Sequence, residues 1–379
     1  MRRLLLFISF LILLYMSWDV IEKQIGTFNN QVAIETIKTE IDMLKDNPEI
    51  SNAITSFFVG LNNFLGQLDQ LKEKQGQDLQ TKTPPVEKPI LATPTEQIFS
   101  IYNIQLGDSK ADAEQQLGVA KRSSLNEYGV DWHTYHENYQ NFMMVGYDEF
   151  DNVVGLYSNQ DLISSTKGIT FGSNKELVSE QLGEPLTSIN KGMVYYQFEE
   201  KRDYEMYLLN DSYVSIFYDK HQENIVTSIQ IISKDLEDKR SDYYTASSEG
   251  LKEGFEYQLF DLTNATRVNH GLQILEWDDR VRETARKHSL DMADNNYFSH
   301  TNLEGQSPFD RMLEDDIAFT MAGENLAYGQ FSSIFAHEGL MNSLGHRENI
   351  LQADFRNLGV GVAFNEKAQP YYTEKFFSQ

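Results

Sequence analysis

The sequence predicts an α+β protein with three parts: an N-terminal helical stalk, a two-repeat α+β domain and a C-terminal α/β/α sandwich. Three observations support this prediction. An apolar stripe with helical spacing occupies residues 54–71, a sequence pattern recurs in the middle of the chain, and apolar helical patterns precede two strand-like runs at the C-terminal end. A chain of 379 residues has room for two or more domains of ordinary size.

Composition excludes several classes of function. The formal net charge is -25, and nucleic-acid binding needs a basic surface, so nucleic acid is excluded as a partner. The chain has no Cys, which excludes disulfides, thiolate metal sites and a Cys nucleophile. The 20 Tyr and 23 Phe residues supply enough apolar surface for real cores, so global disorder is not expected.

The first residues have the pattern of an export segment. Arg2 and Arg3 precede an apolar run from Leu4 to Trp18, which matches the charged and apolar regions of a signal sequence. The run is shorter than the roughly 20 residues of an average membrane-spanning helix, but no small-x-small cleavage site follows it. We interpret residues 1–18 as an uncleaved single-pass signal-anchor with the rest of the chain outside the cytoplasm. The alternative is a cleaved signal peptide and a secreted protein.

Residues 19–80 are expected to form a helical stalk. Apolar residues recur there at three- and four-residue steps, and Asn47-Pro48 suits the boundary between two helices. The stripe would serve as plain packing, a hairpin seam or a surface for self-association. A linker rich in Pro and Thr follows at residues 81–95.

An internal repeat defines a domain at residues 96–235. The segment that begins at Ile104 and ends at Gly118 matches the segment from Ile169 to Gly183, and similar apolar strands follow both. Each copy predicts a short helix ending at a Gly, followed by strands. The acidic run that begins at Asp148 lacks calcium-loop spacing, so it predicts a turn between two strands. This domain contains no catalytic constellation.

The last domain, residues 250–379, predicts helices packed on a small antiparallel sheet. Helical periodicity occurs from Phe255 to Val268, from Val281 to Met292 and across Ser333 to Leu344. The runs at residues 358–364 and 371–377 predict two strands joined by a turn.

Three polar clusters in this domain are expected to converge on one pocket, and they contain His300, Glu324 and His346. Two neutral imidazoles and a carboxylate could hold Zn²⁺ or another divalent cation. Without a metal, a Glu beside two His residues could act as a general base. The third reading is structural, in which these groups hydrogen-bond loop backbones.

Two sharper catalytic motifs are rejected. His337-Glu338 begins like a zinc-protease helix, but Met341 occupies the position of the second His, and a thioether is a poor zinc ligand. Ser343 near His346 has neither a nucleophile elbow nor an orienting Asp. His288 is expected to be a buried core residue, and His270 is expected to lie at the end of a helix.

Several short motifs in this domain resemble, in family order, the CAP superfamily of cysteine-rich secretory, antigen 5 and pathogenesis-related proteins, and in particular its bacterial cysteine-free branch. They are Asn269-His270-Gly271-Leu272, Leu275-Glu276-Trp277-Asp278, Asn296-Tyr297-Phe298-Ser299-His300, Gly323-Glu324-Asn325-Leu326-Ala327, Ser343-Leu344-Gly345-His346-Arg347-Glu348-Asn349-Ile350 and Leu358-Gly359-Val360-Gly361. The repeat domain is similar to the N-terminal domain that accompanies CAP domains in Bacillus-type bacteria.

The resemblance implies a pocket with two His and two Glu residues. Carried over, His300, Glu324 and His346 fill three of these positions. The second Glu is a departure, because this chain has Ser343 one turn before the second His. Glu338 is the nearest upstream carboxylate, but five residues on a helix turn it about 140° away, so it is named only as a candidate.

Two main functions stay open. The first is a membrane-anchored extracytoplasmic binding module whose pocket takes an envelope ligand: a lipid, a peptide or a protein. The second is a metal-dependent or His/Glu-assisted hydrolase acting on envelope peptides or polymers. In a third, structural reading, the stalk drives self-association and the last domain is a rigid head. The missing second Glu and the absence of a recognisable nucleophile favour the binding module.

Overall fold

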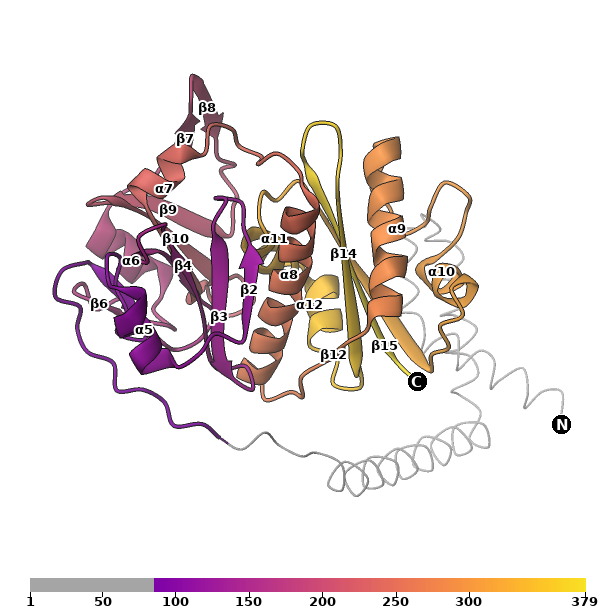
Figure 1. Cartoon of the computed structure of the whole chain (residues 1–379), viewed down its shortest axis with the longest axis horizontal. Helices are drawn as coiled ribbons and strands as arrows, with labels where there is room; N and C mark the ends of the chain where they lie inside the picture. The colour runs from indigo at the N-terminus through magenta and orange to yellow at the C-terminus, as the bar shows by residue number, and fades with distance from the viewer. Residues whose placement is uncertain (1–84) are drawn as a thin grey trace, which may run out of the picture. The chain divides into compact units, whose positions relative to one another are not determined.

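The structure is a computed structural model that describes residues 85–379 (Figure 1). These residues belong to one compact unit, Lys82–Gln379. The expected signal-anchor, the stalk and the first residues of the linker lie outside the described residues. Between residues 85 and 379 no helix is both long and apolar enough to cross a membrane.

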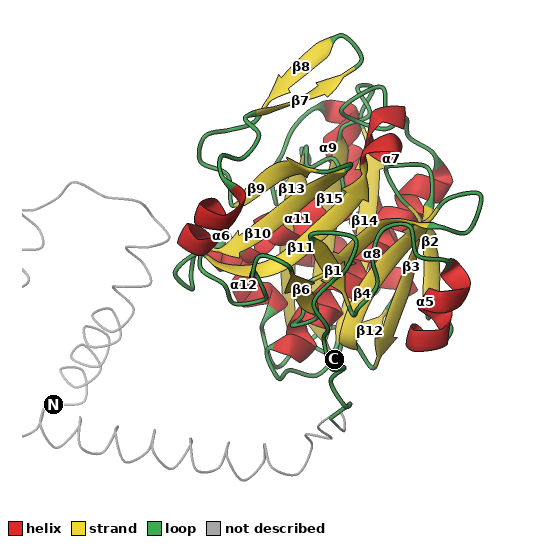
Figure 2. Cartoon of the chain, turned by 90° about the vertical axis from the view of Figure 1, so that its left-hand side faces the viewer, coloured by secondary structure: helices red, strands yellow, loops and turns green. Residues whose placement is uncertain are grey.

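The repeat segment builds a seven-stranded antiparallel sheet of strand order β2-β3-β4-β5-β11-β10-β9 (Figure 2). Its strands are β2 (Arg122–Leu125), β3 (Asp131–Glu137), β4 (Gln140–Tyr147), β5 (Val153–Ser158), β9 (Tyr204–Leu209), β10 (Ser212–Asp219) and β11 (Ile225–Ser233). Smaller elements surround it: β1 (Phe99–Ile101), β6 (Ile163–Ser165), β7 (Ser188–Lys191), β8 (Val194–Gln197), α5 (Lys110–Leu117), α6 (Lys175–Leu182) and α7 (Lys234–Lys239).

The two repeats have the same local structure. Helices α5 and α6 both start at a capping side chain and both end at a Gly with positive φ, 76° at Gly118 and 79° at Gly183. Gly tolerates this conformation because it has no Cβ. The two copies join where β5 pairs with β11, so the predicted repeat is confirmed as two halves of one sheet. The predicted turn is also confirmed, since Asp148 Oδ1 accepts hydrogen bonds from the backbone N–H groups of Phe150 and Asn152.

The C-terminal part forms the predicted α/β/α layers around a four-stranded sheet of order β12-β14-β15-β13. Its strands are β12 (Glu276–Trp277), β13 (Met321–Tyr328), β14 (Asn357–Phe364) and β15 (Pro370–Ser378), and its helices are α8 (Glu249–Asn269), α9 (Asp279–Asn295), α10 (Pro308–Glu314), α11 (Ser333–Met341) and α12 (Leu344–Ile350). In Figure 1, α8 and α9 lie on opposite sides of β14.

Two glycines let α9 lie directly on β14. A Cβ on Gly359 would stand 2.3 Å from the backbone N of Arg282, and a Cβ on Gly361 would stand 2.1 Å from that of Arg286. Any side chain there would push α9 off the sheet.

The prediction of a single third helix from Ser333 to Leu344 is wrong about where that helix ends. The chain breaks at Asn342 and Ser343 into α11 and α12. The side chain of Asn342 donates to the Tyr218 carbonyl oxygen and accepts from the Lys220 N–H, which ties this position to the end of β10. Sequence analysis also missed α10 and β13.

The two parts share a hydrophobic core. One cluster of buried side chains joins Trp132, Tyr157 and Phe217 of the seven-stranded sheet to Phe255 of α8 and Phe335 of α11. Helix α8 lies so close to β2 that a Cβ on Gly254 would stand 2.0 Å from the carbonyl oxygen of Leu125. Helix α8 therefore packs on both sheets and holds them at a fixed separation.

Candidate functional site

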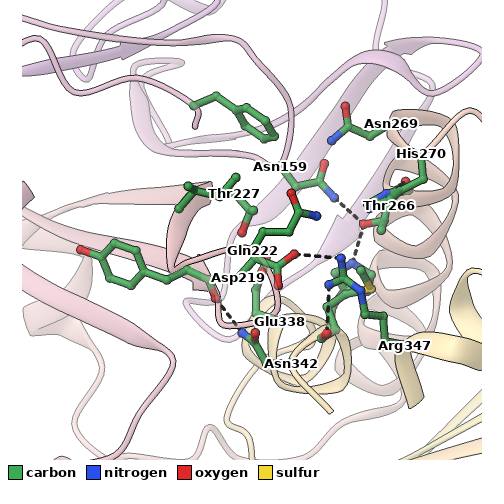
Figure 3. A pocket seen from close by; sticks show the side chains of 15 residues that line it. Asn159, Asp219, Gln222, Thr227, Thr266, Asn269, His270, Glu338, Asn342 and Arg347 are labelled. Carbon is green, nitrogen blue, oxygen red and sulfur yellow. Dashed lines mark hydrogen bonds and ion pairs between the residues drawn. The ribbon is translucent and has the colours of Figure 1, made fainter. Parts of the chain in front are cut away.

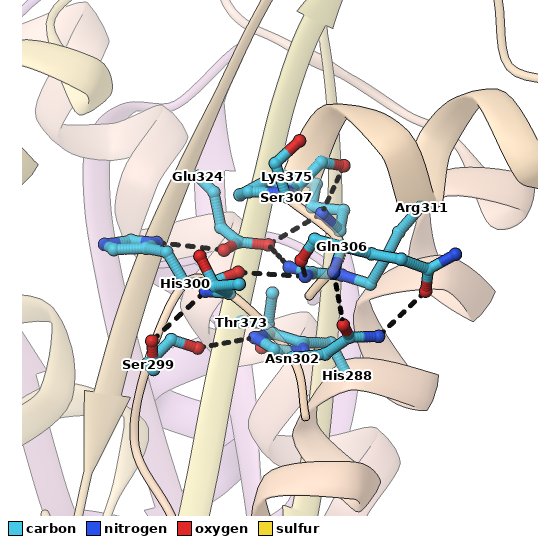
Figure 4. A network of polar contacts seen from close by, with 12 residues as sticks. His288, Ser299, His300, Asn302, Gln306, Ser307, Arg311, Glu324, Thr373 and Lys375 are labelled. Carbon is cyan, nitrogen blue, oxygen red and sulfur yellow. Dashed lines mark hydrogen bonds and ion pairs between the residues drawn. The ribbon is translucent and has the colours of Figure 1, made fainter. Parts of the chain in front are cut away.

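Glu324 lies at the centre of a buried polar cluster between β13, β15 and α10 (Figure 4). It stands opposite Lys375 in the pairing of β13 with β15, and Lys375 Nζ lies 2.6 Å from Glu324 Oε2. Arg311 of α10 reaches the same oxygen at 2.8 Å, and His300 Nδ1 donates to Oε1 at 2.9 Å. Three donors from three segments thus converge on one carboxylate.

The partners of Glu324 decide its protonation state. Burial raises its pKa, but the hydrogen bond from His300 and the charges of Lys375 and Arg311 outweigh burial and hold the pKa at about 2. Burial lowers the pKa of Lys375, and the charge of Glu324 partly offsets that effect. Glu324 is therefore an ionised carboxylate at neutral pH with a low affinity for protons.

The cluster has more positive than negative charge. Arg311 and Lys375 are 7% and 0% exposed, and both take Glu324 as their hydrogen-bonded carboxylate. Arg311 also donates to the backbone carbonyls of His300 and Gln306, so it holds the loop that carries His300. Its Nε is buried without a hydrogen-bond partner among residues 85–379.

His346, on α12, completes the group. Burial lowers its pKa, and the charge of His300 lowers it further. Its Nδ1 is buried and has no hydrogen-bond partner within the described part of the chain. Its carbonyl oxygen accepts from Asn325 Nδ2 at 3.1 Å, which ties α12 to β13. The structure thus brings His300 into contact with Glu324 and ties the backbone of His346 to Asn325, the residue after Glu324.

Asparagines in two of the sequence motifs connect α12, β13 and β15 by side-chain hydrogen bonds. Asn349 donates to the Asn325 side chain at 2.9 Å, and Asn325 donates to the buried carboxyl of Glu374 at 3.0 Å. A Cβ on Gly323 would stand 3.0 Å from Asn349 Oδ1, so the small residue leaves room for the amide. The motif residues around His346 and Glu324 therefore interlock α12 with β13.

The residues present do not fit a divalent metal ion. Both oxygens of Glu324 already accept hydrogen bonds, and the adjacent charges of Arg311 and Lys375 would repel a cation. In the described residues no group of three or more His, Cys, Asp or Glu side chains is arranged to hold a metal ion. Two imidazoles alone do not make a zinc site.

Glu338, the candidate for the second Glu, does not join this cluster. Helix α11 turns it toward the seven-stranded sheet, where its Oε1 accepts from Tyr157 Oη at 2.7 Å and from Ser228 Oγ at 2.6 Å. Ser343, at the position expected for that Glu, stands at the start of α12, and its side chain makes no capping hydrogen bond. The cluster around Glu324 therefore has one carboxylate of the implied pair.

His288 and His270 have the structural positions that the sequence predicts. His288 is buried on α9, its Nε2 lies 3.0 Å from the carbonyl oxygen of Ser299, and burial lowers its pKa to about 4. His270 follows the last residue of α8 as its C-cap.

Sequence analysis missed Arg311 and Lys375, the two cations that define the site. Lys375 did leave a trace in the sequence, because it is the lone basic residue within the apolar run of β15. A charged residue in a buried strand needs a partner, so it could have been matched to Glu324. Arg311 lies in a short polar helix where nothing distinguishes it from a surface residue.

An aromatic surface adjoins the loop that carries His300. Phe298 is 51% exposed, and its ring lies 6.0 Å from that of Tyr328, whose own ring lies tilted at 4.3 Å from that of the buried Tyr371. The side chain of His300 is itself about half exposed. An imidazole and an aromatic ring two residues apart are therefore both accessible from outside.

Comparisons with known proteins agree with this structure. The family model described as CAP-associated N-terminal matches residues 106–243, and the model of the cysteine-rich secretory protein family matches residues 260–376. The chain is 31% identical over 292 residues to the uncharacterized membrane protein YlbC of Bacillus subtilis, covering 72% of this chain and 82% of that protein. It is 41% identical over 135 residues to the uncharacterized protein YkwD of the same organism, covering 36% and 51% respectively.

Two solved structures have the same fold over most of the chain. An extracellular protein containing an SCP domain from Bacillus anthracis has a TM-score of 0.63 and 26% identity, covering 78% of this chain and all of that one. A cysteine-rich secretory protein from Staphylococcus aureus has a TM-score of 0.57 and 16% identity, covering 77% and 98%. With the cluster around Glu324 and both family models in place, the chain belongs to the CAP, or cysteine-rich secretory protein, family and carries a CAP-associated N-terminal domain.

Proposed function

We propose that this protein is a ligand-binding module on the outer side of the cell membrane, and that its pocket at His300 and His346 takes an anionic group of an envelope ligand. The membrane protein YlbC and the extracellular protein from B. anthracis support the location. The apolar segment at residues 4–18 would anchor the chain, and the stalk would hold the folded part away from the lipid.

The observation that carries this proposal is the charge balance at Glu324. Two buried cations share one carboxylate, which leaves one positive charge in excess beside the two imidazoles. Arg311 also keeps an unpartnered Nε within residues 85–379. A carboxylate or phosphate group would be attracted to this position, whereas a metal ion would be repelled.

The same chemistry weighs against the hydrolase alternative. A general base works best when its pKa lies near the working pH, and the pKa of Glu324 is about 2. Arg311 and Lys375 occupy the oxygen that would otherwise accept a proton or bind a metal. Glu324 thus serves to orient His300 and to hold the two cations in place.

The test is a calorimetric titration of the full-length chain, in detergent if the anchor requires it, with acetate, inorganic phosphate and, separately, Zn²⁺. We expect binding of an anion that weakens about tenfold or more in the His300→Ala/His346→Ala double variant. His133→Ala, a histidine on β3 of the other sheet, is the matched control and should bind normally.

Two results would overturn the proposal. Stoichiometric Zn²⁺ binding that the double variant loses would establish a metal site and revive the hydrolase reading. Anion binding that is absent, or that is equal in wild type and double variant, would show that the imidazoles serve the fold alone.

A further inference from the structure

A cavity lies at the junction of the two sheets, away from the cluster around Glu324 (Figure 3). Its volume is about 280 Å³. One wall comes from the seven-stranded sheet and its turns, with Asp219 and Thr227, and the other comes from α8, α11 and α12, with Thr266, Glu338 and Arg347. A molecule in this cavity would touch both halves of the described structure.

Glu338 has an unused hydrogen-bonding oxygen at this cavity. The residue is 7% exposed, and both of its hydroxyl partners, Tyr157 and Ser228, donate to Oε1. Oε2 accepts no hydrogen bond from any residue in the described range. Burial raises the pKa of Glu338 to about 7, the two hydroxyls oppose that effect, and Asp219 adds to it. Oε2 is therefore available to a donor from a molecule in the cavity.

The other titratable side chains that line the cavity are either paired with each other or neutral. Arg347 forms an ion pair with Asp219 at 2.8 Å, so that guanidinium is taken and Glu338 has no cation partner there. His337 is neutral, since burial lowers its pKa to about 3. The titratable and charged groups that line this cavity or hydrogen-bond Glu338 are Asp219 and Tyr218 (β10), Tyr157 (β5), Arg347 (α12), His270 (after α8) and His337 (α11). Glu338 also borders a cavity on its other side, whose titratable and charged groups are Glu199, Lys201, Arg202, Asp203, Tyr204, Tyr243 and Tyr244.

A second acceptor in the cavity wall also lacks a donor. Asn159 is 6% exposed, and its Nδ2 donates to Thr266 Oγ1 at 3.0 Å. Its Oδ1 is buried without a hydrogen-bond partner in the described part of the chain. The cavity therefore offers two acceptors in need of donors, one of them able to carry a negative charge.

We propose that the cavity between the two sheets binds a small organic ligand with a primary ammonium group, which donates to Glu338 Oε2. An ammonium group carries three N–H donors and a positive charge, which matches a carboxylate with a free oxygen. The volume is at the lower limit of ligand pockets, which begin near about 300 Å³, so it suits a small amine or the end of an aminated chain. The net charge of -25 also draws cations to this protein.

This site has no residue in common with the anion pocket proposed above, although both use helix α12, through Arg347 here and through His346 there. A metal ion is a poor alternative occupant, since residues 85–379 contain no set of three suitable ligands. The ligand would also bridge the repeat part and the CAP part, and its binding would stabilise their contact.

The test is a calorimetric titration of the full-length chain with ethanolamine, with 1-propanol and glycolate as neutral and anionic probes of similar size. We expect binding of ethanolamine alone, at a stoichiometry of one, and tighter at pH 8 than at pH 6 because Glu338 must be ionised. Glu338→Gln should weaken it about tenfold or more, since Gln keeps an acceptor for Tyr157 and Ser228 but loses the charge.

Two further variants keep the test decisive. Glu374→Gln changes another buried carboxyl, outside the cavity, and should bind ethanolamine as wild type does. Gln222→Trp places a large side chain on an exposed cavity residue and should block binding while Glu338 stays in place. Equal binding of all three probes, binding that survives both Glu338→Gln and Gln222→Trp, or no ethanolamine binding in the wild type would each overturn the proposal.

Discussion

Two carboxylates in this protein are equally buried and yet differ in charge. Glu324 and Glu338 are both 7% exposed, but the pKa is about 2 for Glu324 and about 7 for Glu338. Glu324 receives two cations and an imidazole, whereas Glu338 receives two neutral hydroxyls. Burial alone therefore does not set the charge of an acidic side chain, and the partners that the fold supplies do.

A third buried carboxyl, Glu374, also shows that the partners set the pKa. Glu374 is 0% exposed, its partners Thr263 and Asn325 are neutral, and its pKa is raised to about 7, as for Glu338. Glu374 lies on β15 next to Lys375, but alternate residues of a strand point to opposite faces. The cation one residue away thus serves Glu324 on one face and leaves Glu374 on the other without a charged partner.

The largest expected effect comes from removing the carboxylate that has charged partners. Glu324→Gln leaves Arg311 and Lys375 buried without a counter-charge, which should lower the free energy of unfolding by about 3–5 kcal/mol at pH 7. Urea denaturation of the two proteins measures this. The control is the double variant Glu324→Gln/Lys375→Met, which removes one of the stranded charges and should recover part of the loss. A cost below about 1 kcal/mol would show that the two cations find other partners.

The next effect is a difference in pH dependence. The pKa of Glu338 is raised from 4.5 to about 7, so its burial favours the protonated form and costs stability as pH rises through this window. Relative to wild type, Glu338→Gln should become more stable by roughly 3 kcal/mol between pH 4.5 and pH 7 and stay so above it. The pH dependence of stability has the opposite sign for Glu324. Its lowered pKa contributes stability that is complete above pH 4.5 and is lost as pH falls toward 2. Urea denaturation of wild type and Glu338→Gln across this pH range measures the difference in the free energy of unfolding. A difference that does not change with pH would contradict the raised pKa of Glu338.

Removing one hydroxyl partner tests the neutral environment of Glu338. Tyr157→Phe should cost about 1 kcal/mol at pH 5, where the carboxyl is protonated, and about 2 kcal/mol at pH 8, where a charged acceptor loses its donor. Tyr135→Phe is the matched control, because its hydroxyl pairs with that of Tyr147 and no carboxyl is involved. Its cost should be the same at both pH values. If both variants behave alike, the hydroxyl of Tyr157 does not support an ionised Glu338.

The smallest effect is expected at His300. Its side chain is about half exposed and supplies one of three hydrogen bonds to Glu324, so His300→Ala should cost less than about 1 kcal/mol. The charges of Lys375 and Arg311 remain, so the pKa of Glu324 should stay below 4.5. Carbon-13 NMR of the Glu324 carboxyl during an acid titration of His300→Ala measures this pKa. A return to the ordinary value would mean that the imidazole, and not the two cations, controls this carboxylate.

Local patterns in the sequence determined much of the fold. The two repeat helices, the glycines at their ends and the final pair of strands all depend on residues a few positions apart, and these were predicted. The motifs also paired His300 with Glu324, which the structure shows in contact, because motif order does not depend on how the chain folds back. Helix α11 shows the limit of this approach, since its end is set by contacts of Asn342 with residues more than 120 positions earlier.

Only the tertiary structure decided what the buried carboxylates do. The two cations on Glu324 lie 13 and 51 positions away, and the hydroxyls on Glu338 come from 181 and 110 positions earlier. The sequence determined that both residues are acidic and that one belongs to a motif. Their charge states depend on which donors the packing of two sheets and the helices between them brings within hydrogen-bonding distance, because electrostatic partners act through space and leave no periodic pattern along the chain.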